Sequence, residues 1–91
     1  MRQPNVTVYG SAACPDTQRA RDFLDAQSVA YEYKDVDESP ELNPYLADLN
    51  HGTRVIPTIR LNNMILINPS EQELSRELKS VTSLIDNQGG S

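Results

Sequence analysis

Hydrophobic and polar positions along the chain follow two periods, which together predict seven elements. Four short segments have the alternation, or the β-branched, aromatic or apolar composition, that is typical of strands: 5–9, 31–36, 55–61 and 64–67. Three longer segments place apolar residues at helical spacing: 15–27, 40–50 and 71–86. The predicted order is strand, helix, strand, helix, strand, strand, helix.

Capping and turn residues mark the ends of these elements. Ser39–Pro40 should begin the second helix, with the serine as its cap and the proline in its first turn. Gly52 supplies the left-handed conformation that ends this helix. Asn62–Asn63 forms a two-residue turn between the last two strands, and Ser70–Glu73 is a capping box that opens the last helix.

This order of elements predicts an α/β fold. The first strand, helix and second strand form a right-handed parallel crossover, and the last two strands add an antiparallel hairpin. The simplest packing is a four-stranded mixed sheet flanked by three helices, β-α-β-α-β-β-α, with helices on both faces. We expect one domain over residues 1–91, with a core at about 5–86 and a frayed tail at 87–91.

Composition and charge narrow the possible partners. The net charge is −5 over 91 residues and basic residues are scattered, which argues against nucleic acid and anionic membranes as partners. No apolar run approaches the length of a membrane span, and no secretory signal is apparent. One cysteine and one histidine are too few for a metal site, and one cysteine cannot form an internal disulfide. We therefore expect a cytoplasmic protein without a bound metal.

The candidate chemistry centres on the one cysteine, Cys14, at the junction between the first loop and the first helix. Pro15 follows it in the first helical position, so Cys14 lies where free backbone N–H groups converge. That field favours a thiolate. Thr17, three residues on, could donate a hydrogen bond to the sulfur, whereas the carboxylate of Asp16 opposes the thiolate. The alternative is a small buried cysteine that serves only packing.

Two motifs carry a resemblance to a known family. Cys14-Pro15-Asp16-Thr17 at a helix start, followed by Arg54-Val55-Ile56-Pro57-Thr58-Ile59, resembles the glutaredoxins. Asn68-Pro69-Ser70 before the last helix is most similar to the bacterial glutaredoxin- and mycoredoxin-like branch. The resemblance covers nearly the whole chain, and it implies a thioredoxin-like fold with a cis peptide bond before Pro57. That geometry would leave the backbone of Ile56 free to pair with a bound cysteine tripeptide.

The sequence departs from the family pattern at three places. Thr17 stands where the family usually has a second cysteine, so the chemistry implied is monothiol. Ser11 replaces a lysine of the glutathione site, and Asn68–Glu71 replaces a glycine-rich segment that binds a carboxylate. Arg54 matches a basic residue of that site, although an ordinary solvated arginine and a threonine chosen only for the helix start are the alternatives.

The resemblance nevertheless assigns a set of site residues. Catalysis would rest on Cys14 and Thr17. The residues expected to bind the substrate thiol are Ser11, Pro15, Asp16, Arg54, Val55, Ile56, Pro57 and Ser70.

The function implied is that of a monothiol thiol–disulfide oxidoreductase. It would reduce mixed disulfides between proteins and glutathione, or a similar low-molecular-weight thiol, which acts as a co-substrate with no tightly bound cofactor. Its partners would be that thiol and thiol-modified proteins, and the protein itself is expected to be a monomer. One alternative is a dimer that holds an iron–sulfur cluster through Cys14 and glutathione, against which Pro15 argues because that group normally has glycine there. Another is a non-catalytic interaction module.

Overall fold

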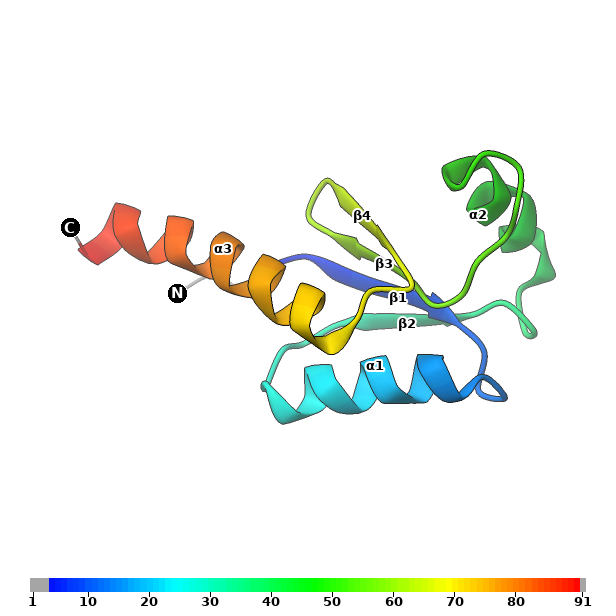
Figure 1. Cartoon of the computed structure of the whole chain (residues 1–91), viewed down its shortest axis with the longest axis horizontal. Helices are drawn as coiled ribbons and strands as arrows, with labels where there is room; N and C mark the ends of the chain where they lie inside the picture. Colours follow the sequence, from blue (N-terminus) through cyan, green and yellow to red (C-terminus); the bar gives the residue numbers. More distant parts are fainter. Residues whose placement is uncertain (1–3, 91) are drawn as a thin grey trace.

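The computed structural model describes residues 4–90, with side chains described for residues 4–81. Figure 1 shows the elements in chain order. They are β1 (Val6–Gly10), α1 (Pro15–Ala26), β2 (Glu32–Asp35), the 3₁₀ helix η1 (Pro40–Leu42), α2 (Asn43–Leu49), β3 (Thr58–Leu61), β4 (Met64–Ile67) and α3 (Glu71–Gly90).

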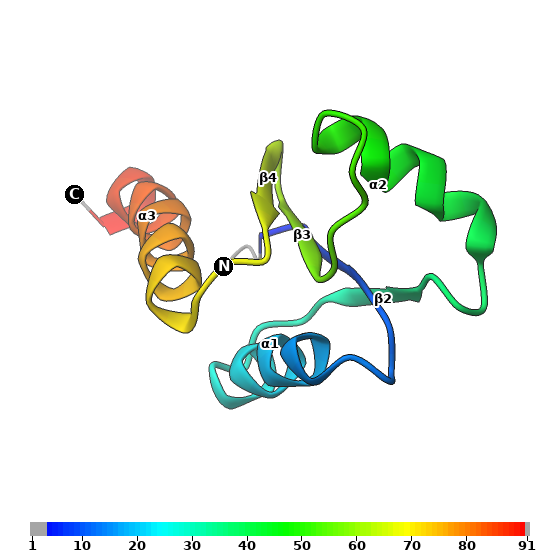
Figure 2. The same cartoon turned by 45° about the vertical axis from the view of Figure 1, so that its right-hand side comes forward.

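The four strands form one mixed sheet in the order β2-β1-β3-β4. β1 runs parallel to β2 and antiparallel to β3, and β3 and β4 form the antiparallel hairpin. Helices α1 and α3 lie on one face of this sheet, and α2 lies on the other (Figure 2). The predicted α/β fold with helices on both faces is confirmed.

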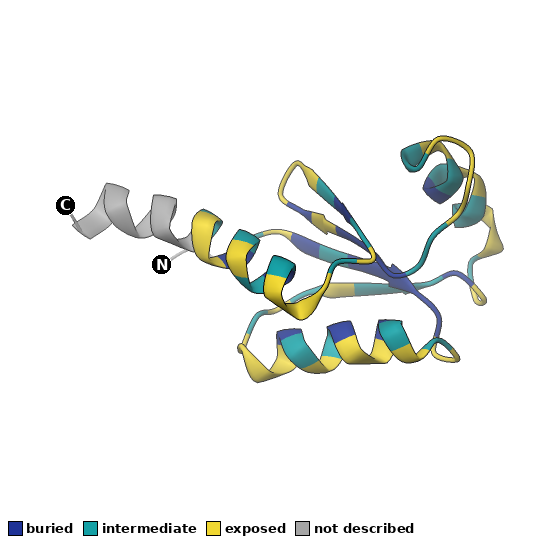
Figure 3. Cartoon of the chain, viewed as in Figure 1, coloured by how far each residue is buried: buried dark blue, intermediate teal, exposed yellow. Residues whose placement is uncertain are grey.

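Each face of the sheet has its own hydrophobic core, and the two differ in size. The larger core lies under α1 and α3 and contains Val6, Val8, Ala20, Leu24, Ile59, Leu61, Leu66, Leu74 and Leu78. The smaller core lies under α2 and contains Tyr9, Val36 and Leu46. Figure 3 shows how the buried residues of α1 and β1 continue toward the loop that joins them.

Two predicted elements are shorter than expected because prolines interrupt them. The third strand begins at Thr58 rather than Val55, since Pro57 has no N–H to donate to a neighbouring strand. The predicted helix at 40–50 is divided into η1 and α2, with Pro44 in the first turn of the second segment. Ser39 precedes η1 but makes no side-chain cap, so that part of the prediction is wrong.

The predicted turns and the last cap are confirmed. Gly52 has φ of +97° after α2, and Asn62 has φ of +56° in the β3–β4 turn. The hydroxyl of Ser70 accepts a hydrogen bond from the Glu73 N–H at 3.0 Å, which caps α3. α3 continues to Gly90, so the tail expected from Asn87 is helical to that point, and Ser91 lies outside the described residues.

Candidate active site

Three segments meet at one edge of the sheet, and they contain most of the expected site residues. Tyr9 pairs with Thr58, and Thr58 pairs with Ile67. The loop that follows β1, the segment that precedes β3 and the segment that follows β4 therefore emerge side by side. Cys14 lies in the first of these segments, at the start of α1.

Cys14 is half-buried and occupies the N-cap position of α1, with the extended backbone angles that this position requires. Its N–H donates to the Ser11 carbonyl at 3.0 Å, and its own carbonyl accepts from Gln18 N–H at 3.2 Å. Pro15 takes the first helical position, as predicted. The sulfur is thereby held at the end of the helix where backbone N–H groups are free.

The surroundings of Cys14 lower the pKa of its thiol. The largest cause is a hydrogen bond with the Thr17 side chain, and the backbone N–H groups of Thr17 and Asp16 add to it. Partial burial and the charge of Asp16 act in the opposite direction. Because the thiolate is the nucleophile in disulfide exchange, this environment suits Cys14 to attack a disulfide.

Thr17 is buried beneath the loop, with 1% of its surface exposed. Its Oγ1 accepts a hydrogen bond from the Ser11 N–H at 3.3 Å. Gly10 lies directly against it, and a Cβ atom at position 10 would overlap the Thr17 side chain. Thr17 is therefore packed between the loop and the end of β1, and, at the position where the resemblance implies a second cysteine, it cannot form a disulfide.

Ser11 is also buried, with 6% of its surface exposed. Its hydroxyl donates to Asp37 and accepts from the Ala13 N–H at 3.2 Å. The sequence suggested that Ser11 contacts a substrate thiol, but the structure places its hydroxyl inside the loop with its hydrogen bonds already made. A role within the loop fits this position better than contact with a ligand.

The end of β2 supports the same loop through carboxylates. The side chain of Asp35 accepts hydrogen bonds from the Ala12 N–H at 3.1 Å, the Tyr33 hydroxyl at 2.9 Å and the Asp37 N–H at 2.8 Å. Desolvation alone would raise the pKa of Asp35, but these hydrogen bonds lower it. Burial, together with Asp35, raises the pKa of Tyr33 to about 12, and Arg21 lies over the Tyr33 ring at 3.8 Å.

The segment before β3 has a different character. The peptide bond between Ile56 and Pro57 is cis. The Pro57 carbonyl accepts from the Asn68 N–H at 2.8 Å, and the Thr58 hydroxyl donates to the Val55 carbonyl at 2.8 Å. Within residues 4–81, the backbone N–H and carbonyl of Ile56 make no hydrogen bond. Arg54 is exposed, and its guanidinium donates to the Asn43 side chain at 3.0 Å.

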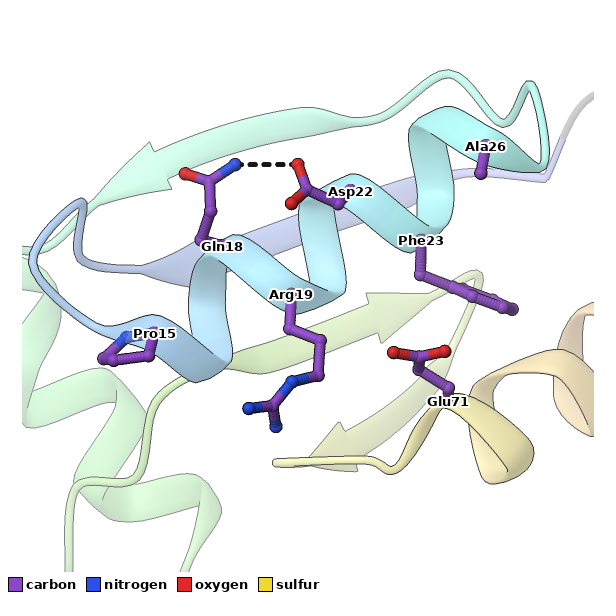
Figure 4. A pocket seen from close by; sticks show the side chains of 7 residues that line it. All are labelled: Pro15, Gln18, Arg19, Asp22, Phe23, Ala26 and Glu71. Atoms are coloured by element: carbon purple, nitrogen blue, oxygen red, sulfur yellow. Dashed lines mark hydrogen bonds between the residues drawn. The ribbon is translucent and has the colours of Figure 1, made fainter.

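A groove of about 630 Å³ runs along α1, from Pro15 beside Cys14 toward the end of the helix (Figure 4). Its lining residues are Pro15, Gln18, Arg19, Asp22, Phe23, Ala26 and Glu71. The guanidinium of Arg19 is paired with Asp16 at 2.8 Å, so Asp16 faces its own helix partner. Glu71 reaches into the groove from the start of α3, next to the capping residue Ser70.

The sequence did not identify four residues that shape this site: Gly10, Tyr33, Asp35 and Asp37. The signal was present, because a strand parallel to β1 ends beside the loop that follows β1. Polar residues directly after such a strand therefore reach that loop. In the residues that the structure describes, no group of three metal-ligating side chains occurs, and no helix is long and apolar enough to cross a bilayer.

The fold and the position of the thiol define the class of protein. A mixed sheet of this order, with a cysteine at the start of the first helix, is the arrangement of thioredoxin-like proteins. A solved glutaredoxin structure from Archaeoglobus fulgidus superposes with a TM-score of 0.70 at 20% identity, covering 80% of this chain and 84% of that chain. This similarity confirms the thioredoxin-like fold.

Sequence comparison then gives the family. The sequence model of the glutaredoxin family matches residues 6–66. Mycoredoxin 1 of Corynebacterium glutamicum is 34% identical over 59 residues, which cover 65% of this chain and 72% of that protein. A candidate glutaredoxin of Mycobacterium tuberculosis is 26% identical over 77 residues, 84% of this chain and 92% of that protein. The chain belongs to the glutaredoxin family, a redox family, as its two motifs predict.

Proposed function

We propose that this protein is a monothiol thiol–disulfide oxidoreductase that removes low-molecular-weight thiols from proteins. The observation that carries the proposal is the surroundings of Cys14, the one cysteine of the chain. Its sulfur lies at a helix N-terminus and interacts with Thr17, which replaces the second thiol of dithiol relatives. A thiolate is favoured there, and no neighbouring thiol can displace a bound adduct.

The proposed cycle has two exchange steps. The Cys14 thiolate attacks the thiol-side sulfur of a protein mixed disulfide, a new disulfide joins Cys14 to the small thiol, and the protein leaves as a thiolate that takes up a proton. A second small thiol then attacks the adduct as its thiolate. The small-molecule disulfide leaves, and the Cys14 thiolate is restored. Thr17 stabilises Cys14 as the nucleophile of the first step and as the leaving group of the second.

The segment before β3 is the proposed docking place for the small thiol. The free N–H and carbonyl of Ile56 suit pairing with the backbone of a cysteine residue, in the manner of an added strand. Val55 and Pro57 flank this position. Arg54 adds a cation for a carboxylate, since its contact with Asn43 leaves its charge unpaired by that neighbour.

The other side of the thiol would lie toward the starts of α1 and α3. Pro15 and Asp16 border this side on α1. The hydroxyl of Ser70 is used to cap α3, so only the free backbone N–H groups of its first turn would remain for a ligand. Glutathione is one candidate thiol, and the similarity to a mycoredoxin makes mycothiol another. We expect the protein to act as a cytoplasmic monomer with no tightly bound cofactor.

The test measures release of the small thiol from modified peptides. Glutathionylated and mycothiolated peptides are offered to the wild type and to Cys14→Ser, each with the matching thiol for recycling. We expect turnover by the wild type above the uncatalysed rate and none by Cys14→Ser. Absence of turnover with every thiol, in a folded protein with a free Cys14, would contradict the proposal and favour cluster binding or a non-catalytic role.

A further inference from the structure

We propose that Gly10, Ser11 and Asp37 are positioning residues that direct the Thr17 hydroxyl toward the sulfur of Cys14. The proposal rests on Cys14 being the reactive thiol of the proposed function. In the described residues, the side chains of Ser11 and Asp37 make no hydrogen bond to the sulfur, and Gly10 has no side chain. Their effect is to fix which way the hydroxyl proton of Thr17 points.

The Thr17 hydroxyl has one hydrogen-bond donor to place. A hydroxyl has one proton to give and two lone pairs to accept with. The Ser11 N–H can only donate, so it occupies a lone pair of Thr17 Oγ1. Because Thr17 is 1% exposed, water does not compete for the remaining proton. That proton is therefore available to the Cys14 sulfur, where donation stabilises the thiolate.

Hydrogen bonds on both its side chain and its backbone hold Ser11 in place. Its hydroxyl donates a hydrogen bond to the Asp37 carboxylate. The same oxygen accepts from the Ala13 N–H, and the Ser11 carbonyl accepts from the Cys14 N–H. With both its side chain and its carbonyl held, Ser11 presents its N–H to Thr17 in one direction.

The space beside β1 also limits where the Thr17 side chain can lie. Gly10 precedes Ser11, and a Cβ atom at this position would overlap the Thr17 side chain. Glycine at position 10 therefore lets Thr17 lie against the end of the strand. Asp37 is held in turn, because its N–H donates to Asp35, whose carboxylate also accepts from Ala12.

The direction in which the thiol pKa of Cys14 changes distinguishes a positioning role from an effect of charge alone. The charged groups around the loop include Asp16, which is paired with Arg19, and the carboxylates of Asp35, at the end of β2, and Asp37, which follows it. Replacement of Asp37 by alanine removes a negative charge, which would by itself leave the thiol pKa unchanged or lower it. Loss of the positioning contact should instead raise the thiol pKa.

The experiment titrates the Cys14 thiolate by its ultraviolet absorbance in the free protein, with no small thiol present. We expect Asp37→Ala and Gly10→Ala to raise the thiol pKa by about one pH unit, equivalent to a tenfold loss of thiolate well below the pKa. Ser11→Ala should give a smaller rise, and Asp37→Asn, which retains an acceptor oxygen, should stay near the wild type. Glu38→Ala is the matched control, since it removes a neighbouring exposed carboxylate whose side chain makes no hydrogen bond or salt bridge in the described residues.

The outcomes are separable from those of the turnover test. If Asp37→Ala behaves like Glu38→Ala while circular dichroism shows an intact fold, the positioning role is wrong, whatever the enzyme turns over. If the thiol pKa rises as expected but no mixed disulfide is reduced, the positioning stands and the proposed function fails. If Gly10→Ala does not fold, the comparison of Asp37→Ala with Asp37→Asn still decides.

Discussion

The loop before Cys14 and the segment before β3 lie at the same edge of the sheet, yet they use their polar groups in opposite ways. Between Ser11 and Cys14, backbone and side-chain groups are hydrogen-bonded to Thr17, Asp35 and Asp37. At Ile56, the backbone N–H and carbonyl are free within residues 4–81. We call the loop from Ser11 to Cys14 the built region, because its own hydrogen bonds hold it, and the segment at Ile56 the open region, because its backbone groups are free in the described residues.

In the proposed function, the built region would serve the chemistry of the thiol and the open region would serve binding of the substrate. Preorganised donors around a reacting atom do not need to rearrange when charge develops on it. Free strand-like backbone groups offer affinity to any ligand with a peptide-like backbone. Changes in the built region should therefore alter the reactivity of the thiol, and changes in the open region should alter the binding of the substrate.

The largest expected effect comes from removing the sulfur while leaving both regions in place. Cys14→Ser should reduce turnover to the uncatalysed rate, because serine is a far weaker nucleophile than a thiolate. Binding should persist, since the groups at Ile56 and Arg54 are unchanged. Thermal stabilisation by an S-methylated small thiol measures that binding. Loss of the stabilisation together with turnover would show that the two regions do not act separately.

Thr17→Val should come next in size. It keeps the shape of the side chain but removes the hydroxyl whose interaction lowers the pKa of the Cys14 thiol, so that pKa should rise and turnover near neutral pH should fall by about tenfold. The rate should recover as the pH rises through the new pKa, whereas KM for the thiol should stay the same. Thr17→Ser, which keeps a hydroxyl, is the control. A pH profile unchanged in Thr17→Val would contradict the assigned interaction.

Arg54→Ala tests the open region. Removal of the guanidinium should raise KM for an acidic thiol such as glutathione by roughly threefold to tenfold, the value of one charge-assisted hydrogen bond near the surface. The thiol pKa of Cys14 should not change. Arg54→Lys should retain part of the effect, and a neutral thiol should be insensitive to both variants. A shift in the thiol pKa would mean that Arg54 acts on the thiol, as the residues of the built region do.

Asp16→Asn should produce the smallest effect, with the opposite sign. The Asp16 carboxylate raises the pKa of the Cys14 thiol, so its neutralisation should lower that pKa by a few tenths of a pH unit. The lower limb of the pH–rate profile should move to lower pH by the same amount. Rate measurements across the lower limb of the profile, made in parallel with the wild type, would detect it. An upward shift would mean that the helix start is disturbed, because Asp16 also holds Arg19.

The sequence predicts the open region and the position of Cys14 at the helix start better than it predicts the built region. Cys14, Pro15 and Pro57 carry their meaning in their residue type, because thiol chemistry and proline geometry are local properties. The capping box at Ser70 was likewise visible as a pattern of neighbouring residues. The first approximation of the fold followed from periodicity alone.

The parts of the site that the sequence did not predict depend on contacts between residues that are far apart along the chain. Asp37 meets Ser11 across 26 positions, and Asp35 meets Ala12 across 23. Only the parallel pairing of β1 with β2 brings them together. The lengths of β3 and of the second helix were overestimated for a simpler reason, since Pro57 and Pro44 each remove a donor that a regular element needs.

Buried Thr17 also sets how the proposed reaction would respond to its surroundings. A protein that closes its own disulfide consumes two small thiols when it is reduced, so its balance depends on the total amount of thiol as well as on its oxidation. Here the oxidised form would be a mixed disulfide, which one small thiol reduces as one small-molecule disulfide leaves. The oxidised fraction would then follow the ratio of disulfide to thiol and would not change on dilution. A threonine at position 17 would make the protein respond to the composition of the thiol pool and ignore its size.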